Sequence, residues 1–275
     1  MSASSLLTPR VYLLDIEGTV APIAFVYEQL FPYARTHFES FLWKSIHDLE
    51  QKKNELGAQD MSKGSVLMDL MLLWMENRAE TDPEAPRILP NVVFEPGFKG
   101  DPNTFSMSSA LGIPRILAYI NWLMDRDRKS TALKSLQGKI WKAGFESGEL
   151  KGTLFADVPE ALARWTEKAR VAIYSSGSVE AQRLVFRYST FGDLTPLIAE
   201  YFDTRAGPKR ASASYAAIAA SLEVPPDEVA FFSDVVEELD AAREAGCGTR
   251  LVLRPGNAPI DDRNSHQTLE SFVPL

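Results

Sequence analysis

The stretch that decides the fold is Val-Tyr-Leu-Leu-Asp-Ile-Glu-Gly-Thr, residues 11–19. Its first four residues form a short, continuous apolar run, which is typical of a strand buried on both faces of a parallel sheet. The run ends in two acids, a glycine and a threonine, so polar side chains follow the strand at once. We therefore expect a buried strand at 11–14 with a functional loop at its carboxyl end.

Three similar apolar runs follow in the second half of the chain, at 171–174, 229–232 and 249–253. Amphipathic helical patterns lie between them, and strands that alternate with helices predict an α/β fold with a Rossmann-like parallel sheet. The first two of these runs end in serines or an acid, and ligands bind at the carboxyl ends of the strands in such sheets. We expect the functional residues to gather at that edge.

The long stretch between the runs at 11–14 and 171–174 predicts an inserted domain, because a crossover between parallel strands needs only about a dozen residues. Apolar stripes at 116–124 and 133–141 have helical spacing. We expect an α/β core made of residues 1–23 and 149–275, with a helical cap, 24–148, inserted after the first strand. The proline-rich segment 83–102 predicts a long surface loop in this cap.

The composition restricts the class of function. The chain has 275 residues and a formal net charge of -8, which argues against nucleic acid or a membrane surface as a partner because both select basic patches. Cys247 is the only cysteine, so neither an intramolecular disulfide nor a cysteine-rich zinc site is expected. Residues 1–7 do not resemble a signal peptide, and the apolar run at 66–75 is too short to cross a membrane. We expect an intracellular protein.

Asp15 and Glu17 are the first candidate catalytic residues. Their spacing of two, just after a strand, directs both side chains to the same side. A carboxylate can attack phosphorus to give an aspartyl-phosphate, and a second one can protonate the leaving oxygen. Gly18 permits a sharp turn, and Thr19 can hydrogen-bond a phosphate or orient Asp15. The alternative is a polar turn that starts a helix.

Two later segments carry candidate phosphate-binding groups. Ser175, Ser176 and Gly177 follow the second core strand, where serine hydroxyls and backbone N–H groups can cradle a phosphate; an ordinary serine helix cap is the alternative. Lys209 lies in a loop before a predicted helix and can neutralise both a phosphate and a carboxylate nucleophile. Its neighbour Arg210 competes for the same role.

Asp234 and Glu238 follow the third core strand at a spacing of four residues, which places them on one face of a helix. Carboxylate oxygens suit Mg²⁺, which binds through few protein ligands and keeps several waters. The alternative is a capping box, in which an acid near the helix start only satisfies backbone N–H groups.

Taken in order, these four segments resemble the four motifs of the haloacid-dehalogenase superfamily of phosphotransferases. More narrowly, the chain is similar to the acireductone synthases, the enolase-phosphatases of methionine salvage. The segments that carry this likeness are 14–19, 22–26, 30–33, 129–138, 174–182, 201–204 and 254–257. Glu17 is informative, because most phosphatases of the superfamily have an aspartate at this place and glutamate is typical of the enolase-phosphatase branch.

The resemblance implies a bifunctional, magnesium-dependent enzyme. Asp15, Glu17 and Asp234 would surround one Mg²⁺ per subunit, while Ser175, Ser176 and Lys209 would hold the phosphate. The implied substrate is 5-(methylsulfanyl)-2,3-dioxopentyl phosphate, which is enolised and then dephosphorylated to the acireductone. We further expect a monomer located in the cytoplasm and also in the nucleus.

Two other hypotheses stay open at this point. The chain could be a different capped, magnesium-dependent phosphatase of the same superfamily that acts on another small phosphate. It could also be a non-catalytic phospho-acceptor or scaffold domain, since an acidic cluster with a lysine occurs in receivers as well. The long insertion argues against a receiver, because a receiver needs its aspartate open to a partner. The residue that takes the proton during enolisation cannot be named from the sequence.

Overall fold

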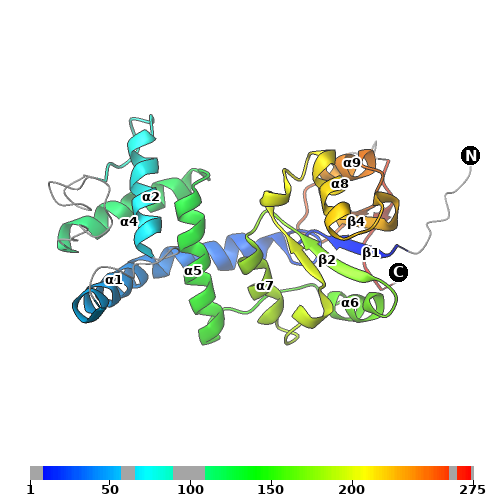
Figure 1. Ribbon diagram of the computed structural model, residues 1–275, viewed down its shortest axis with the longest axis horizontal. Helices are drawn as coiled ribbons and strands as arrows, with labels where there is room; N and C mark the ends of the chain where they lie inside the picture. The colour runs from blue at the N-terminus through cyan, green and yellow to red at the C-terminus, as the bar shows by residue number, and fades with distance from the viewer. Residues whose placement is uncertain (1–8, 57–65, 89–108, 260–264, 274–275) are drawn as a thin grey trace, which may run out of the picture. The chain divides into compact units, whose positions relative to one another are not determined.

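The computed structural model describes residues 9–56, 66–88, 109–259 and 265–273. The chain divides into two compact units, one made of Met1–Leu30 and Gly144–Leu275 and the other of Phe31–Ala143. Most of their helices and strands are labelled in Figure 1. The predicted boundaries of core and cap, and the role of the insertion as a cap, stay predictions.

A parallel sheet forms the centre of the first unit, with strand order β3-β2-β1-β4-β5-β6 in the described residues. The strands are β1 (Val11–Leu14), β2 (Arg170–Tyr174), β3 (Glu200–Phe202), β4 (Val229–Ser233), β5 (Gly248–Val252) and β6 (Thr268–Leu269). All neighbouring pairs are parallel. The α/β fold predicted from the apolar runs is therefore confirmed. The short strands β3 and β6 were not predicted.

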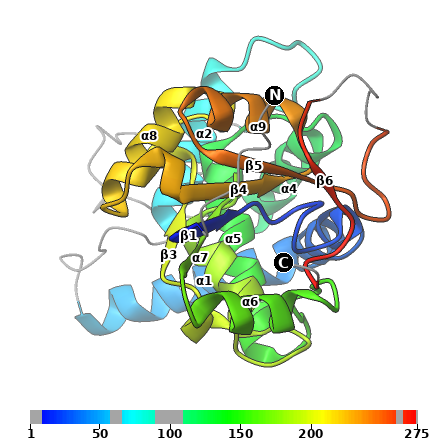
Figure 2. The same ribbon diagram turned by 90° about the vertical axis from the view of Figure 1, so that its right-hand side faces the viewer.

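Helices cover both faces of this sheet. Figure 2 shows α8 (Ser212–Ser221) and α9 (Val236–Glu244) on one side and α6 (Val158–Thr166) on the other. Alternate residues along a strand point to opposite faces. Leu13 and Phe231 accordingly pack into a cluster with residues of α8 and α9, whereas the ring of Tyr12 stacks on Trp165 of α6 at 4.4 Å. Burial on both faces explains why β1 and the first four residues of β4 are apolar. Helix α7 (Val179–Arg187) also belongs to this unit.

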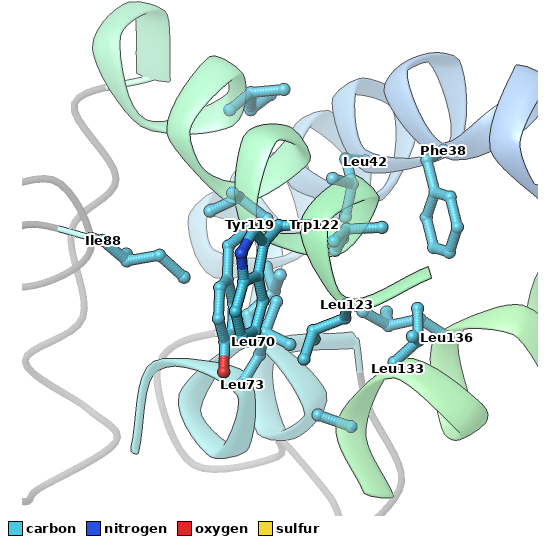
Figure 3. Close-up of a cluster of buried hydrophobic side chains, with 14 of the residues drawn as sticks. Phe38, Leu42, Leu70, Leu73, Ile88, Tyr119, Trp122, Leu123, Leu133 and Leu136 are labelled. Atoms are coloured by element: carbon cyan, nitrogen blue, oxygen red, sulfur yellow. The ribbon is translucent and has the colours of Figure 1, made fainter. Parts of the chain in front are cut away.

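The inserted unit is mostly helical in its described residues, apart from connections such as 80–88 and 126–130. A π-helical segment, Phe25–Leu30, leads into α1 (Phe31–Leu56), and α2 (Val66–Ala79), α4 (Ser109–Asp125) and α5 (Thr131–Ser147) follow. Figure 3 shows side chains from these helices meeting in one apolar cluster, among them Phe38, Leu70, Tyr119 and Leu136. The helical stripes predicted from the sequence thus serve as core packing within this unit.

The predicted proline-rich loop falls only partly within the described chain. Residues 80–88 contain no helix or strand, and their turn is fixed by the buried Asn77, which donates to the carbonyl of Pro86 and accepts from the N–H of Ile88. The remainder of the predicted loop lies outside the described residues. Within the described ranges, no helix is long and apolar enough to cross a membrane.

Candidate active site

The register of the sheet brings the predicted site segments to one edge. Leu14 of β1 pairs with Ile173 of β2 and with Phe232 of β4. The residues that follow these strands therefore start at the same level, and the N–H of Asp15 donates to the carbonyl of Phe232 at 2.9 Å. Three loops consequently stand side by side, as expected for the carboxyl edge of a parallel sheet. They are the loop after β1, which carries the candidate nucleophile Asp15 (the nucleophile loop), the loop 175–177 after β2 (the serine loop) and the loop after β4 with Asp234.

Asp15 is almost completely buried, with an exposed fraction of 3%. The N–H of Ile16 donates to its Oδ1 at 2.8 Å, and Nζ of Lys209 lies 2.6 Å from the same oxygen. Two donors on one oxygen fix the orientation of the carboxylate, so the direction of its other oxygen, Oδ2, is fixed as well. The hydroxyl of Thr19 is buried and has no hydrogen-bond partner among the described residues, so Thr19 does not orient Asp15 here.

Lys209 lies between two carboxylates, because its Nζ is also 2.7 Å from Oε2 of Glu238. Burial by itself would lower the pKa of Lys209, but Asp15 and Glu238 outweigh it and raise that pKa above its usual range. The ammonium is therefore charged at neutral pH. The competing residue Arg210 is exposed, and its guanidinium lies 3.9 Å from Glu237 instead. The structure thus shows that Lys209, and not Arg210, lies at the carboxylates, a choice that the sequence left open.

Glu238 has a different partner from the one its spacing suggests. Helix α9 begins only at Val236, so Asp234 precedes the helix and does not share its face with Glu238. The carboxylate of Glu238 receives Lys209 and the hydroxyl of Ser233, the latter at 3.0 Å. The alternative of a capping box is not realised either, because Val235 occupies the cap position and makes no side-chain cap bond.

Asp234 packs directly against the nucleophile loop. Gly18 has a φ of +72°, and a Cβ placed on it would lie 2.3 Å from Oδ2 of Asp234. Burial and the charge of Asp15 raise the pKa of both Asp234 and Glu17 to about 7. Burial, followed by the charge of Asp15, also raises the pKa of Glu238. These shifts arise because four carboxyl groups, those of Asp15, Glu17, Asp234 and Glu238, lie close together in a buried place beside one ammonium.

This excess of carboxylates fits a divalent cation. In the described residues, no three side chains of Asp, Glu, His or Cys form a ready-made metal cluster. Mg²⁺ does not need one, since it binds through one or two carboxylates and keeps several waters. The predicted ligand set of Asp15, Glu17 and Asp234 is thus chemically suitable but stays a prediction.

Gly18→Ala is expected to disturb the site by displacing the Asp234 carboxylate. Gly192→Ala is the matched control, because Gly192 also has a positive φ, +91°, but nothing lies within 4 Å of its added Cβ. Both variants should lose about 1–2 kcal/mol of unfolding free energy from the left-handed backbone. Only Gly18→Ala should also lower turnover, by roughly tenfold to a hundredfold. Equal activity of the two variants in a phosphate-release assay would contradict this reading.

The serine loop is held by a residue of α7. Ser175 is buried, and its Oγ accepts the N–H of Gly177 at 3.3 Å. The amide nitrogen of Gln182 donates at 2.8 Å to the carbonyl of Gly177 and also to that of Phe202. Ser176 is exposed at the end of the strand. The helix cap of α7 is Ser178, so the first two serines are not needed for capping. Gly177 has neither a positive φ nor a close Cβ contact that would demand glycine.

The segment after β5 adds residues that sequence reasoning did not assign to the site. The guanidinium of Arg254 donates to the carbonyl of Thr19 at 3.1 Å and to Asp157 at 3.0 Å. Asn257 donates to the carbonyl of Gly18 at 3.0 Å. The two side chains therefore brace the nucleophile loop from outside. Their positions after a core strand were the available signal, but no spacing rule identifies the loop that they contact.

Comparisons with known proteins agree with this geometry. Residues 9–246 match the family of haloacid dehalogenase-like hydrolases. Enolase-phosphatase E1 from Synechococcus elongatus is 48% identical over 264 residues, which cover 96% of this chain and 96% of that protein. The chain belongs to the enolase-phosphatase E1 family.

A moss member of the enolase-phosphatase E1 family, from Physcomitrium patens, is 40% identical. It is called a probable bifunctional methylthioribulose-1-phosphate dehydratase/enolase-phosphatase E1, and the match covers 97% of this chain and 48% of that protein. Among solved structures, the Unknown transcript 4 protein of Saccharomyces cerevisiae matches with a TM-score of 0.65 and 33% identity, over 97% of this chain and 100% of that one.

Proposed function

We propose that this chain is a magnesium-dependent enolase-phosphatase that acts on 5-(methylsulfanyl)-2,3-dioxopentyl phosphate in L-methionine salvage. The products are phosphate and the acireductone 1,2-dihydroxy-5-(methylsulfanyl)pent-1-en-3-one. The observation that carries the phosphatase chemistry is the buried Lys209 ammonium, 2.6 Å from Asp15 at the carboxyl end of β1. The family membership supports the choice of substrate.

The moss relative adds a chemical argument for that substrate. Its name joins a methylthioribulose-1-phosphate dehydratase to an enolase-phosphatase. Loss of water from a ketose phosphate leaves a second carbonyl beside the first, so the dehydratase delivers a 2,3-diketone phosphate. Such a diketone has acidic protons on the carbon that bears the phosphate, and it is therefore a suitable substrate for enolisation followed by hydrolysis.

The residues of the site support a two-step phosphate transfer. Asp15 attacks phosphorus, the bond from phosphorus to the substrate oxygen breaks, and Glu17 gives that oxygen a proton. A water then attacks the aspartyl-phosphate, Glu17 takes its proton, and the bond from phosphorus to Asp15 breaks. Lys209, together with Ser175 and Ser176, holds the phosphate oxygens throughout. We propose Gly177 and Thr19 as secondary phosphate contacts and Glu238 as the anchor of Lys209.

Asp15, Glu17 and Asp234 are the residues that we propose to hold one Mg²⁺ per subunit. When held there, Mg²⁺ would shield the phosphate from the charge of Asp15 and would stabilise negative charge on substrate oxygens. We further propose that the protein works as a monomer in the cytoplasm and also in the nucleus, with a small phosphorylated diketone as its partner rather than nucleic acid or a membrane.

Removal of the metal is expected to abolish activity reversibly. Dialysis against EDTA should reduce phosphate release to background, and added Mg²⁺ should restore it, because Asp15 cannot approach an unshielded phosphate. Ca²⁺ is the control, since it also neutralises charge but prefers longer bonds and more ligands. Full turnover after complete removal of divalent ions would contradict a role for the metal.

A substrate comparison tests the proposed function. With the diketone phosphate and Mg²⁺, we expect phosphate release together with a new ultraviolet absorbance from the conjugated enediol. Rapid turnover of sugar phosphates with none of the diketone phosphate would indicate another phosphatase of the superfamily. The absence of any phosphatase activity would indicate a non-catalytic domain: a phospho-acceptor if Mg²⁺ binding still responds to beryllofluoride, and a scaffold domain if it does not.

A further inference from the structure

The loop that carries Lys209 is held by a row of buried hydroxyl groups. Three consecutive backbone carbonyls, those of residues 207–209, each accept a hydrogen bond from a different side chain. The bonds are Tyr174 Oη to Gly207 O at 2.9 Å, Ser214 Oγ to Pro208 O at 2.8 Å and Tyr215 Oη to Lys209 O at 2.7 Å. All three donor residues are at most 2% exposed. We call Tyr174, Ser214 and Tyr215 the hydroxyl clamp.

The clamp joins two elements of the core to a loop that has no regular structure. Tyr174 is the last residue of β2, whereas Ser214 and Tyr215 lie in the first turn of α8. The rings of Tyr174 and Tyr215 meet edge to face with centroids 5.6 Å apart, and Tyr215 also packs against Phe231 of β4 at 5.0 Å. The hydroxyls are therefore presented by rings that the core immobilises.

The loop itself fits closely against the clamp. Gly207 has a φ of +127°, and a Cβ on it would lie 2.2 Å from Oγ of Ser214. Only glycine allows the backbone to come this near. A buried carbonyl needs a hydrogen-bond partner, but a loop could satisfy that need in many arrangements. Three successive hydrogen bonds from rigid donors select one arrangement of the loop.

This arrangement matters because lysine has a long, flexible side chain. The Lys209 ammonium nevertheless lies within 2.7 Å of both Asp15 and Glu238, and 5.9 Å from the centre of the Tyr174 ring. Fixing the backbone at 207–209 fixes the point from which the side chain starts. Tyr174 also directly precedes Ser175, so one residue links the lysine loop to the serine loop.

We propose that Tyr174, Ser214 and Tyr215 are positioning residues, whose hydroxyls set the place of the Lys209 ammonium for phosphate binding and transfer. This inference rests on the proposed function, because it requires Lys209 to act on the phosphate. The hydroxyls do not touch the reacting atoms. They act through the backbone of the loop.

The first test removes single hydroxyls. Tyr174→Phe and Tyr215→Phe should each reduce kcat/KM for the diketone phosphate by about tenfold, and the double variant by about a hundredfold. Their Kd for inorganic phosphate in the presence of Mg²⁺ should rise as well. Tyr201→Phe is the matched control, since Tyr201 is buried in the same unit but its hydroxyl has no partner among the described residues. Ser214→Ala replaces either tyrosine variant if that variant does not fold.

A double-mutant cycle separates positioning from general stability. Tyr215→Phe is combined with Lys209→Gln, or with Lys209→Arg if the glutamine variant does not fold. If the clamp acts through Lys209, the tyrosine substitution should have little further effect in these backgrounds. If Tyr215→Phe lowers kcat/KM by the same factor in the parent chain and in the Lys209 variant, the proposal is overturned, because the tyrosine then has a merely structural role.

The outcomes also distinguish the clamp from the function on which it rests. If Lys209→Gln keeps the turnover and phosphate affinity of the parent chain, the proposed role of Lys209 and the proposed role of the clamp are both wrong. If Lys209→Gln is severely impaired while Tyr174→Phe and Tyr215→Phe behave like Tyr201→Phe, the proposed role of the clamp is wrong but that of Lys209 stands. Inorganic phosphate as a probe keeps the test valid if the chain hydrolyses a different phosphate.

Discussion

Replacing Asp15 with asparagine is expected to reduce phosphate release by about 10⁴-fold or more, because an amide cannot form the acyl-phosphate. The fold should survive. Asparagine has nearly the same shape, and its Oδ1 can still accept the N–H of Ile16. The Lys209 ammonium also keeps Glu238 as its charged partner, so no buried charge is left unpaired. We therefore expect circular dichroism and thermal unfolding close to those of the parent chain.

The control for this variant is Asp227→Asn, the same chemical change at an exposed position of the same unit. It should leave turnover unchanged. Mass spectrometry of the Asp15→Asn protein excludes a false residual rate from deamidation back to aspartate. Turnover equal to that of the parent chain, with asparagine still intact at 15, would show that another group attacks phosphorus.

Lys209→Met is expected to have the second largest effect, on stability as well as on activity. The substitution leaves Asp15 and Glu238 buried without the ammonium that lies 2.6 and 2.7 Å from them. Breaking a buried ion pair by removing one partner costs about 3–5 kcal/mol. Urea unfolding should detect that loss, and phosphate release should fall by roughly 10²–10³-fold because a charged group that stabilises the transition state is gone.

Arg210→Met is the matched control for this second prediction. It removes the neighbouring cation, whose side chain is 69% exposed and 3.9 Å from Glu237. An exposed pair contributes at most about 1 kcal/mol, so stability and turnover should change little. If Arg210→Met were the more damaging variant, the geometry of this loop would not be the one that operates in the reaction.

The sequence predicted those parts of the fold that depend on local pattern. The apolar runs at β1, β2 and β4 are long enough to predict a strand, because each strand is buried on both faces. The short strands β3 and β6, of 3 and 2 residues, carry no such pattern and pair only at the sheet edges. Their existence depends on the neighbouring strand, not on their own residues.

The partners of the site residues were harder to predict. The spacing of Asp234 and Glu238 suggested one shared cation, whereas Glu238 contacts Lys209 and Ser233 instead. The spacing rule assumed that the helix already included Asp234, but α9 starts two residues later. Likewise, nothing in the order of residues favours Lys209 over Arg210, because both lie in one loop and only the packing of that loop decides which side chain turns inward.

By itself, the sequence determined the parallel α/β sheet, the polar loops at its strand ends and the likeness that indicates an enolase-phosphatase. The stretch 11–19 contains a strand and the candidate nucleophile in one continuous pattern. Both could therefore be predicted directly from the sequence. Only the tertiary structure decided which groups meet. The bond from Tyr174 of the hydroxyl clamp to Gly207, and the contacts of Arg254 and Asn257 with the nucleophile loop, join residues far apart in the chain. Such contacts depend on strand order and register, which no local pattern encodes.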